Sequence, residues 1–171
     1  APTPGEFMMA FDGRIRALVT AHDLLTANAW QGASLHDVVT RPLAPYAKHD
    51  GAGHEIGISG PPVRFESEAA VTLHMALHEL ATNAAKYGAL SVSDGRVHVS
   101  WQVDDASSQL RLKWVESGGP QVTPPARMGY GTRLIQSTTT YSLYGRVEQE
   151  YATDGLRTEI VIPLGTVSPP S

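Results

Sequence analysis

The segment HELATNAAKYG, residues 78–88, constrains the fold of this chain more than any other part of the sequence. In the longer stretch 68–87, leucines and alanines recur at steps of three and four, which predicts a helix that is buried along one side. Glu79, Asn83 and Lys86 stand at i, i+4 and i+7 and therefore share a different face. Such a helix must pack its apolar side on a core, so its polar stripe lines either solvent or a pocket.

The polar stripe has the chemistry of a magnesium and phosphate site. Asn83 offers a neutral oxygen to a hard cation that keeps most of its waters. Glu79 can order a water molecule or accept a proton, and Lys86 carries a point charge that suits phosphate. An exposed polar face is also what most amphipathic helices show, so the stripe alone leaves both interpretations open.

Composition favours one soluble domain. The chain has 171 residues, 42% of them hydrophobic, and a net charge of -4 with no segment rich in Lys and Arg, which argues against a nucleic-acid partner. No apolar run reaches the roughly 18 residues of a membrane span. The absence of cysteine excludes a thiol nucleophile and fits a reducing compartment. Because the chain opens without an initiator methionine, we expect a fragment of a longer protein.

The remaining patterns predict an α+β domain. Ser34 is expected to cap a helix that Pro42 and Pro45 end, and Gly88 is expected to close another in the left-handed conformation. We expect the helices to cover one face of a mixed, mainly antiparallel sheet in a two-layer sandwich. The predicted helices are 6–28, 34–43, 68–87 and 132–144, and the predicted strands are 55–59, 63–65, 96–103, 109–116, 146–151 and 157–164.

Two glycine-bearing elements lie at the two ends of segment 117–131, which we expect to be a mobile loop over a site. Glu116 ends a strand and precedes Gly118 and Gly119, where the backbone can approach a ligand closely, so the amino group of a purine is a plausible guest. Gly129-Tyr130-Gly131-Thr132 precedes a helix, whose first amides attract phosphate. An ordinary strand end and a flexible helix entry are the alternative interpretations.

Taken in order, these elements resemble the ATP-binding domain of the Bergerat, or GHKL, superfamily, and most closely the HWE subfamily of sensor histidine kinases. The resemblance covers nearly the whole chain. Residues 78–91 are similar to the subfamily's N box, including its characteristic His78, and Trp114-Val115-Glu116 is similar to its W-x-E element. The resemblance implies one arm of a dimerisation hairpin at 1–30, a Bergerat-type sandwich at 31–165 and a disordered tail at 166–171.

The resemblance also implies a site for ATP and Mg²⁺. By it, Asn83 binds Mg²⁺, Lys86 contacts phosphate and Glu116 meets the adenine amino group. The implied catalytic residues are Glu79, which orders a metal-bound or attacking group, and His78. The other implied nucleotide-binding residues are Tyr87, Gly118, Gly119, Gly129, Gly131, Thr132 and Thr158. Most of the superfamily has Asp at the position of Glu116 and many histidine kinases have a phenylalanine-bearing lid, and both departures fit the subfamily.

The implied function is that of the catalytic domain of a two-component histidine kinase in the bacterial cytoplasm. The family's acceptor helix reads roughly H-R-x-K-N, which is absent here, so we expect nucleotide binding without self-phosphorylation. The implied partners are a response regulator, the rest of the kinase chain and, through the N-terminal helix, a second copy. The alternatives are a phosphorelay scaffold that has lost ATP binding and a serine kinase or ATPase of the same superfamily.

The remaining histidines provide no obvious acceptor. His74 and His78 stand at i, i+4 and could chelate a metal, but the HExxH order of zinc proteases is absent. The others are expected to have surface or packing roles: His22, His36, His49, His54 and His98.

Overall fold

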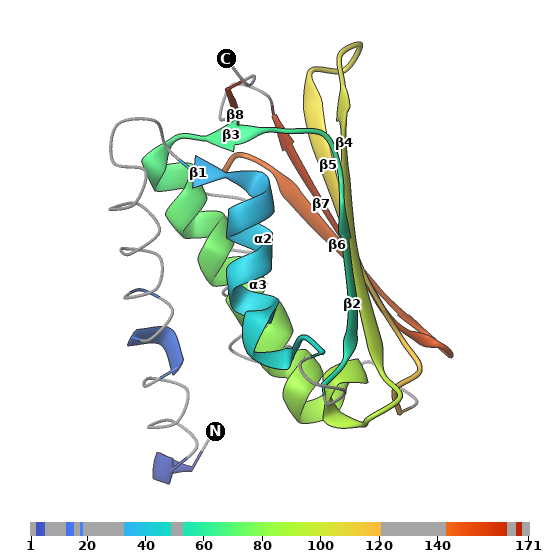
Figure 1. Cartoon of the computed structure of the whole chain (residues 1–171). Helices are drawn as coiled ribbons and strands as arrows, with labels where there is room; N and C mark the ends of the chain where they lie inside the picture. Colours follow the sequence, from blue (N-terminus) through green and yellow to red (C-terminus); the bar gives the residue numbers. More distant parts are fainter. Residues whose placement is uncertain are drawn as a thin grey trace.

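The computed structural model of the chain describes residues 3–5, 13–15, 18, 33–48, 53–120, 143–163 and 167–168. Two helices, α2 (Leu35–Leu43) and α3 (Ser67–Tyr87), cover one face of a five-stranded sheet (Figure 1). The strand order is β2-β4-β5-β7-β6, and only the β2–β4 pair is parallel. The strands are β2 (Glu55–Ser59), β4 (Arg96–Asp104), β5 (Gln109–Ser117), β6 (Arg146–Ala152) and β7 (Gly155–Pro163). The predicted two-layer α+β sandwich with a mainly antiparallel sheet is confirmed.

A second, smaller sheet lies at one end of the sandwich. Its central strand, β3 (Arg64–Phe65), pairs on one side with β1 (Ala33–Ser34) and on the other with β8 (Val167–Ser168). Within the tail predicted at 166–171, the structure describes the two residues of β8, which pair with β3. The sequence there has no strand pattern of its own, and the order comes from hydrogen bonding to β3.

The core forms between α3 and the inner face of the large sheet. Every second residue of β4, β5 and β7 points inward, as the period of a strand requires. On α3 the predicted apolar face is fully buried, with Leu73, Leu77, Leu80 and Ala84 at most 1% exposed. Burying that face fixes which side of α3 meets the sheet, so the polar stripe lies outside this contact.

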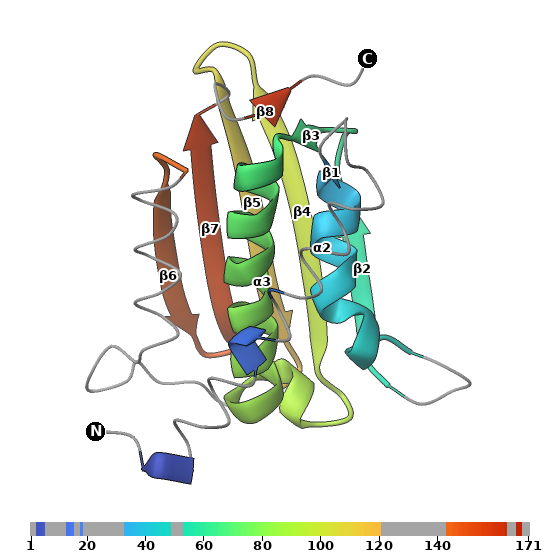
Figure 2. The ribbon, with the colours of Figure 1, turned by 90° about the vertical axis from the view of Figure 1, so that its left-hand side faces the viewer.

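The first predicted helix, 6–28, is described only in part. Residues 13–15 and 18 are helical, and they lie on the side of α3 that faces away from the sheet (Figures 1 and 2). The described part of the N-terminal segment therefore adds a third layer, outside the sandwich. No described helix combines the length and the apolar character that crossing a membrane requires.

Two local predictions for the helix ends need correction. The Ser34 cap is confirmed, since its hydroxyl accepts a hydrogen bond from the Asp37 amide at 3.1 Å. Pro42, however, lies inside the last turn of α2, and Pro45 falls in the 3₁₀ turn η1 (Ala44–Tyr46). Gly88 ends α3 with φ -115° and ψ -148°, outside the left-handed region, because it is needed there for a close approach described below.

The strands at 55–59, 96–103, 109–116, 146–151 and 157–164 are confirmed to within two residues at each end. Most of the predicted helix 132–144, and the part 121–131 of the predicted loop, lie outside the described residues.

Candidate functional site

The polar stripe of α3 runs from a buried end to an exposed one. Glu79 is only 8% exposed, Asn83 is half-buried, and Lys86 is exposed in the last turn. Lys86 is close enough to Glu79 to lower the pKa of its carboxyl group. The predicted side-by-side placement on one face of the helix therefore holds for Glu79 and Lys86, and Asn83 lies between them.

The carboxylate of Glu116 lies at the C-terminal end of α3, where it is 2% exposed. Oε1 accepts a hydrogen bond from the Ala89 amide at 3.0 Å, and Oε2 accepts one from Nε1 of Trp114, also at 3.0 Å. Burial raises the pKa of Glu116, and these two donors act against the rise. An ionised carboxylate has about four acceptor positions, so two protein donors leave capacity for the amino group of a bound base.

Glycines make this close packing possible. A Cβ on Gly88 would stand 2.2 Å from Oε1 of Glu116, and one on Gly119 would stand 2.6 Å from Cα of Ala89. Gly118 has φ +71°, and a Cβ there would meet the backbone oxygen of Asp94 at 2.5 Å. The end of β5, the end of α3 and the turn η2 (Ala89–Ser91) therefore meet backbone to backbone, and any side chain at these glycines would fill the junction.

Further polar groups extend from Glu116 across the inner face of the sheet. Thr158 is 2% exposed, pairs in register with Trp114, and its Oγ1 lies 3.3 Å from Nε2 of Gln149. Tyr151 lies near enough to Glu116 for that carboxylate to help raise the pKa of the phenol, after burial. Because most of this face is apolar, a polar strip at one end of it is a natural place for a polar ligand.

The other end of the polar stripe contacts the N-terminal segment. Nε of Arg14 lies 3.1 Å from Oε1 of Glu79, and the two side chains are 20% and 10% exposed. Burial raises the pKa of Glu79, while Arg14 and then Lys86 act in the opposite direction. A buried carboxylate with a cation beside it is a suitable general base, provided that it stays ionised.

The two histidines of α3 lie beside this ion pair. Burial, and then Arg14, lower the pKa of His78. His74 is fully buried, and burial, His78 and Arg41 together lower its pKa to about 4, against a smaller opposing effect of the Val38 backbone. Both histidines are therefore neutral near pH 7. No group of three or more His, Cys, Asp or Glu side chains gathers to hold a metal among the described residues.

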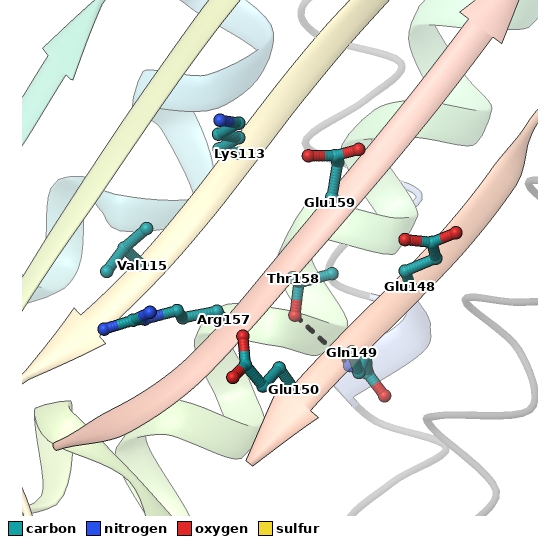
Figure 3. Close-up of a pocket in the computed structure, with 8 residues that line it drawn as sticks. All are labelled: Lys113, Val115, Glu148, Gln149, Glu150, Arg157, Thr158 and Glu159. Atoms are coloured by element: carbon teal, nitrogen blue, oxygen red, sulfur yellow. Dashed lines mark hydrogen bonds between the residues drawn. The ribbon is translucent and has the colours of Figure 1, made fainter. Parts of the chain in front are cut away.

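A shallow cavity of about 350 Å³ opens on strands β5, β7 and β6 (Figure 3). Two of its five charged side chains form ion pairs, Arg157 with Asp154 at 3.1 Å and Glu159 with Arg111. It shares only Thr158 with the predicted nucleotide-binding residues, so we interpret it as a solvated face of the sheet. Its lining consists of Lys113, Val115, Glu148, Gln149, Glu150, Arg157, Thr158 and Glu159.

The structure brings Glu116 and Gly119 together with the end of α3, and it places Thr158 beside Trp114. Tyr87 stands 72% exposed at the end of that helix, and His78 faces the N-terminal segment. Gly129, Gly131 and Thr132 lie outside the described residues.

Sequence reasoning missed four residues near the two carboxylates, Arg14, Gly88, Ala89 and Tyr151, and it missed Gln149, which lies beside Thr158. Gly88 carried a signal, since a glycine at a helix end can serve close approach as well as chain reversal. Arg14 carried none, because its partner is 65 positions away in the chain and no spacing rule connects them.

Comparison with known proteins finds histidine kinases. Residues 1–62 match the family model described as HWE histidine kinase. A blue-light-activated histidine kinase of Brucella anthropi is 39% identical over 156 residues, which cover 90% of this chain and 31% of that protein. The homologue of Brucella ovis is 36% identical over 94% of this chain and 33% of its own length. The chain thus spans about a third of the length of these curated relatives.

Solved structures show the same fold. The histidine kinase domain of the Erythrobacter litoralis EL346 blue-light-activated kinase superposes with a TM-score of 0.69 and 18% identity, covering 90% of this chain and 74% of that one. Full-length ShkA in complex with AMPPNP gives a TM-score of 0.57 and 16% identity, covering 95% of this chain and 40% of that one. At these identities the likeness shows the fold alone, and it agrees with the predicted two-layer sandwich.

Proposed function

We propose that this chain is the ATP-binding catalytic part of a sensor histidine kinase, because residues 1–62 match the HWE histidine kinase model and 90% of the chain aligns at 39% identity with a blue-light-activated histidine kinase. The observation that carries the proposal is the buried Glu116 carboxylate, which lies against Gly88 at the end of α3. A carboxylate with spare acceptor positions, set in a polar strip of an apolar face, suits the amino group of adenine.

The polar stripe of α3 suits the phosphates. Asn83, half-buried between two charged residues, provides the neutral oxygen that a hard cation accepts, and Lys86 is exposed where it can reach a phosphate. A bound Mg²⁺ would supply positive charge that neutralises the phosphate oxygens.

The proposed reaction moves the γ-phosphoryl group of ATP to a histidine. The bond between the γ-phosphorus and the bridging oxygen breaks, a phosphorus–nitrogen bond to the imidazole forms, and ADP leaves. The ring proton must go to a base, and Glu79 is the buried carboxylate that we assign to this role. The HWE-type relatives and the absence of an H-R-x-K-N helix support an acceptor outside this sequence.

The proposed partners follow from the same reaction. We propose a response regulator as the final phosphate acceptor, the rest of the kinase chain as the source of the acceptor histidine, and the bacterial cytoplasm as the location. Ile15 and Leu18 are 46% and 54% exposed on the N-terminal segment, which supports pairing with a second copy along that helix.

Calorimetry with Mg-ATP tests the proposal. We expect the parent chain to bind, and Asn83→Ala and Glu116→Ala to bind at least about tenfold more weakly, since each removes a direct ligand contact. Gln102→Ala, on the exposed outer side of β4, is the matched control and should equal the parent. No heat from the parent, with Asn83→Ala indistinguishable from it, would indicate a scaffold instead, whereas a parent and an Asn83→Ala variant that bind equally well would contradict the role of Asn83.

Two further readouts separate the proposed kinase part from its alternatives. Incubation with labelled ATP should leave the chain unlabelled, and an acid-labile phosphohistidine on it would show that an acceptor lies within these residues. Sustained release of phosphate by the isolated chain would favour an ATPase of the same fold.

A further inference from the structure

The contact between the N-terminal segment and α3 falls on the carboxylate that we assign to catalysis. Arg14 and Glu79 belong to different layers of the molecule, yet they form an ion pair at 3.1 Å from which solvent is mostly withdrawn. The ion pair between Arg96 and Glu55 on the sheet is 3.2 Å long but 66% and 72% exposed. Water and salt screen the exposed pair strongly and the buried one weakly, so the Arg14–Glu79 contact carries the larger electrostatic effect.

The backbone of the segment is fitted to the same place on α3. A Cβ added at Gly13 would stand 4.0 Å from Cε1 of His78, which is ordinary van der Waals distance. Ile15, the next residue, is 46% exposed, so it turns outward while Arg14 turns toward α3. The segment therefore packs on α3 at His78 and Glu79.

The cations beside Glu79 favour its ionised form. Burial raises the pKa of its carboxyl group, and Arg14 and then Lys86 oppose that rise. Lys86 is exposed, so water screens its charge, whereas Arg14 shares the buried surroundings of Glu79. His78, the titratable neighbour on the same helix, has a lowered pKa and adds no positive charge near pH 7.

We propose that Arg14 is a positioning residue for phosphoryl transfer: its guanidinium keeps the Glu79 carboxylate ionised and held in one orientation. Glu79 is then a competent base only while the segment around Arg14 is docked on α3. This inference rests on the proposed function, because Glu79 has to accept a proton only if a histidine is phosphorylated. It makes the N-terminal segment a structural condition of catalysis.

The test is a pH titration of Glu79 followed by ¹³C NMR, in the whole chain labelled at its glutamate carboxyl carbons. The Glu79→Gln variant identifies the signal. We expect Arg14→Gln to raise the titration midpoint of Glu79 by about 1 to 3 pH units, the usual effect of removing an adjacent opposite charge. Arg14→Lys should raise the Glu79 midpoint by at most about half as much, because the positive charge remains. Arg96→Gln, which removes the exposed pair, is the matched control and should leave the midpoint unchanged.

Each outcome decides the proposal. A midpoint in Arg14→Gln equal to that of the parent, with an unchanged circular dichroism spectrum, overturns it. So does an Arg14→Lys midpoint as high as that of Arg14→Gln, and this comparison decides the question if Arg14→Gln does not fold. Mg-ATP calorimetry on the same samples keeps the two proposals apart. A parent chain without binding heat contradicts the proposed function, whereas binding heat with an unmoved Glu79 midpoint contradicts only the role of Arg14.

Discussion

The two buried carboxylates of this domain, Glu116 and Glu79, are stabilised by different kinds of partner. Glu116 accepts hydrogen bonds from a backbone amide and an indole, both fixed parts of the sandwich. Glu79 pairs with a guanidinium that comes from a separate layer. Burial raises the pKa of both. The first arrangement persists as long as the domain is folded, which suits recognition of a base. The second depends on where the N-terminal segment lies, which suits a group whose activity is conditional.

The largest expected effect on stability comes from disrupting the surroundings of Glu116. Trp114→Ala removes the largest fully buried side chain and the Nε1 donor to Glu116, so we expect it to lower the free energy of unfolding by about 3–5 kcal/mol. Trp114→Phe keeps most of the volume and loses the donor, and should cost about 1–3 kcal/mol. Urea denaturation measures both, and a Trp114→Phe variant as stable as the parent would mean that the indole N–H contributes nothing to holding Glu116.

The next effect concerns the Glu79 end and is seen as a pH dependence. His74 has a folded-state pKa of about 4 against 6.5 for a free histidine, so the unfolded chain binds the extra proton between these values. Stability should therefore fall as pH is lowered from about 6.5 to about 4, by roughly 2–3 kcal/mol.

The raised pKa values of Glu79 and Glu116 have the opposite effect on stability. As pH falls toward 4.5, the folded state binds these protons more tightly than the unfolded state does, so these two groups add stability. His74→Leu isolates the histidine contribution, and urea midpoints at several pH values measure it. A His74→Leu variant that loses as much stability in acid as the parent would contradict the assignment.

A smaller change sharpens the role of the glycine junction. In Gly88→Ala the new methyl carbon would lie 2.2 Å from Oε1 of Glu116, so the carboxylate has to move. We expect a loss of about 1–3 kcal/mol in stability and at least tenfold in Mg-ATP affinity, with no change in the Glu79 titration. Gly57→Ala, where the contact is the flexible His98 ring on the sheet, is the comparison. Unchanged Mg-ATP affinity in Gly88→Ala would show that the Glu116 position does not govern binding.

The smallest expected effect sets the baseline for the ion pairs. Arg96→Ala removes an exposed pair with Glu55 and should change stability by no more than about 0.5 kcal/mol in urea denaturation. A larger loss would mean that exposed pairs of this sheet contribute as much as the buried one, and the contrast drawn between Arg14 and Arg96 would fail.

Local patterns predicted most of the described fold. The alternation in β4 and β5 and the three- and four-residue spacing of α3 are direct consequences of burying one face, so sequence spacing reveals them. The β3–β8 pairing escaped prediction because it joins short segments that are far apart in the chain, and two-residue strands carry no period.

The site residues likewise fall into those that local patterns predicted and those that they did not. Glu79, Asn83 and Lys86 share a helix, so their proximity follows from geometry, and Glu116 could be placed at the end of its strand. The partners of the two carboxylates could not be predicted from spacing. Ala89 contributes a backbone amide, which every residue type has, and Arg14 meets Glu79 only through the packing of separate layers. Contacts of this kind depend on tertiary structure and leave no local signature.

The three-stranded sheet has a consequence for how this domain joins a longer polypeptide. Because β1 and β8 flank the same strand, the beginning and the end of the sandwich emerge at one corner, at the top of Figure 1. A unit whose two ends leave side by side can be inserted between, or fused after, other domains without stretching its own chain. Any pull or twist that neighbouring domains exert is then delivered to that corner, which lies next to the first turn of α3, the helix that carries Glu79.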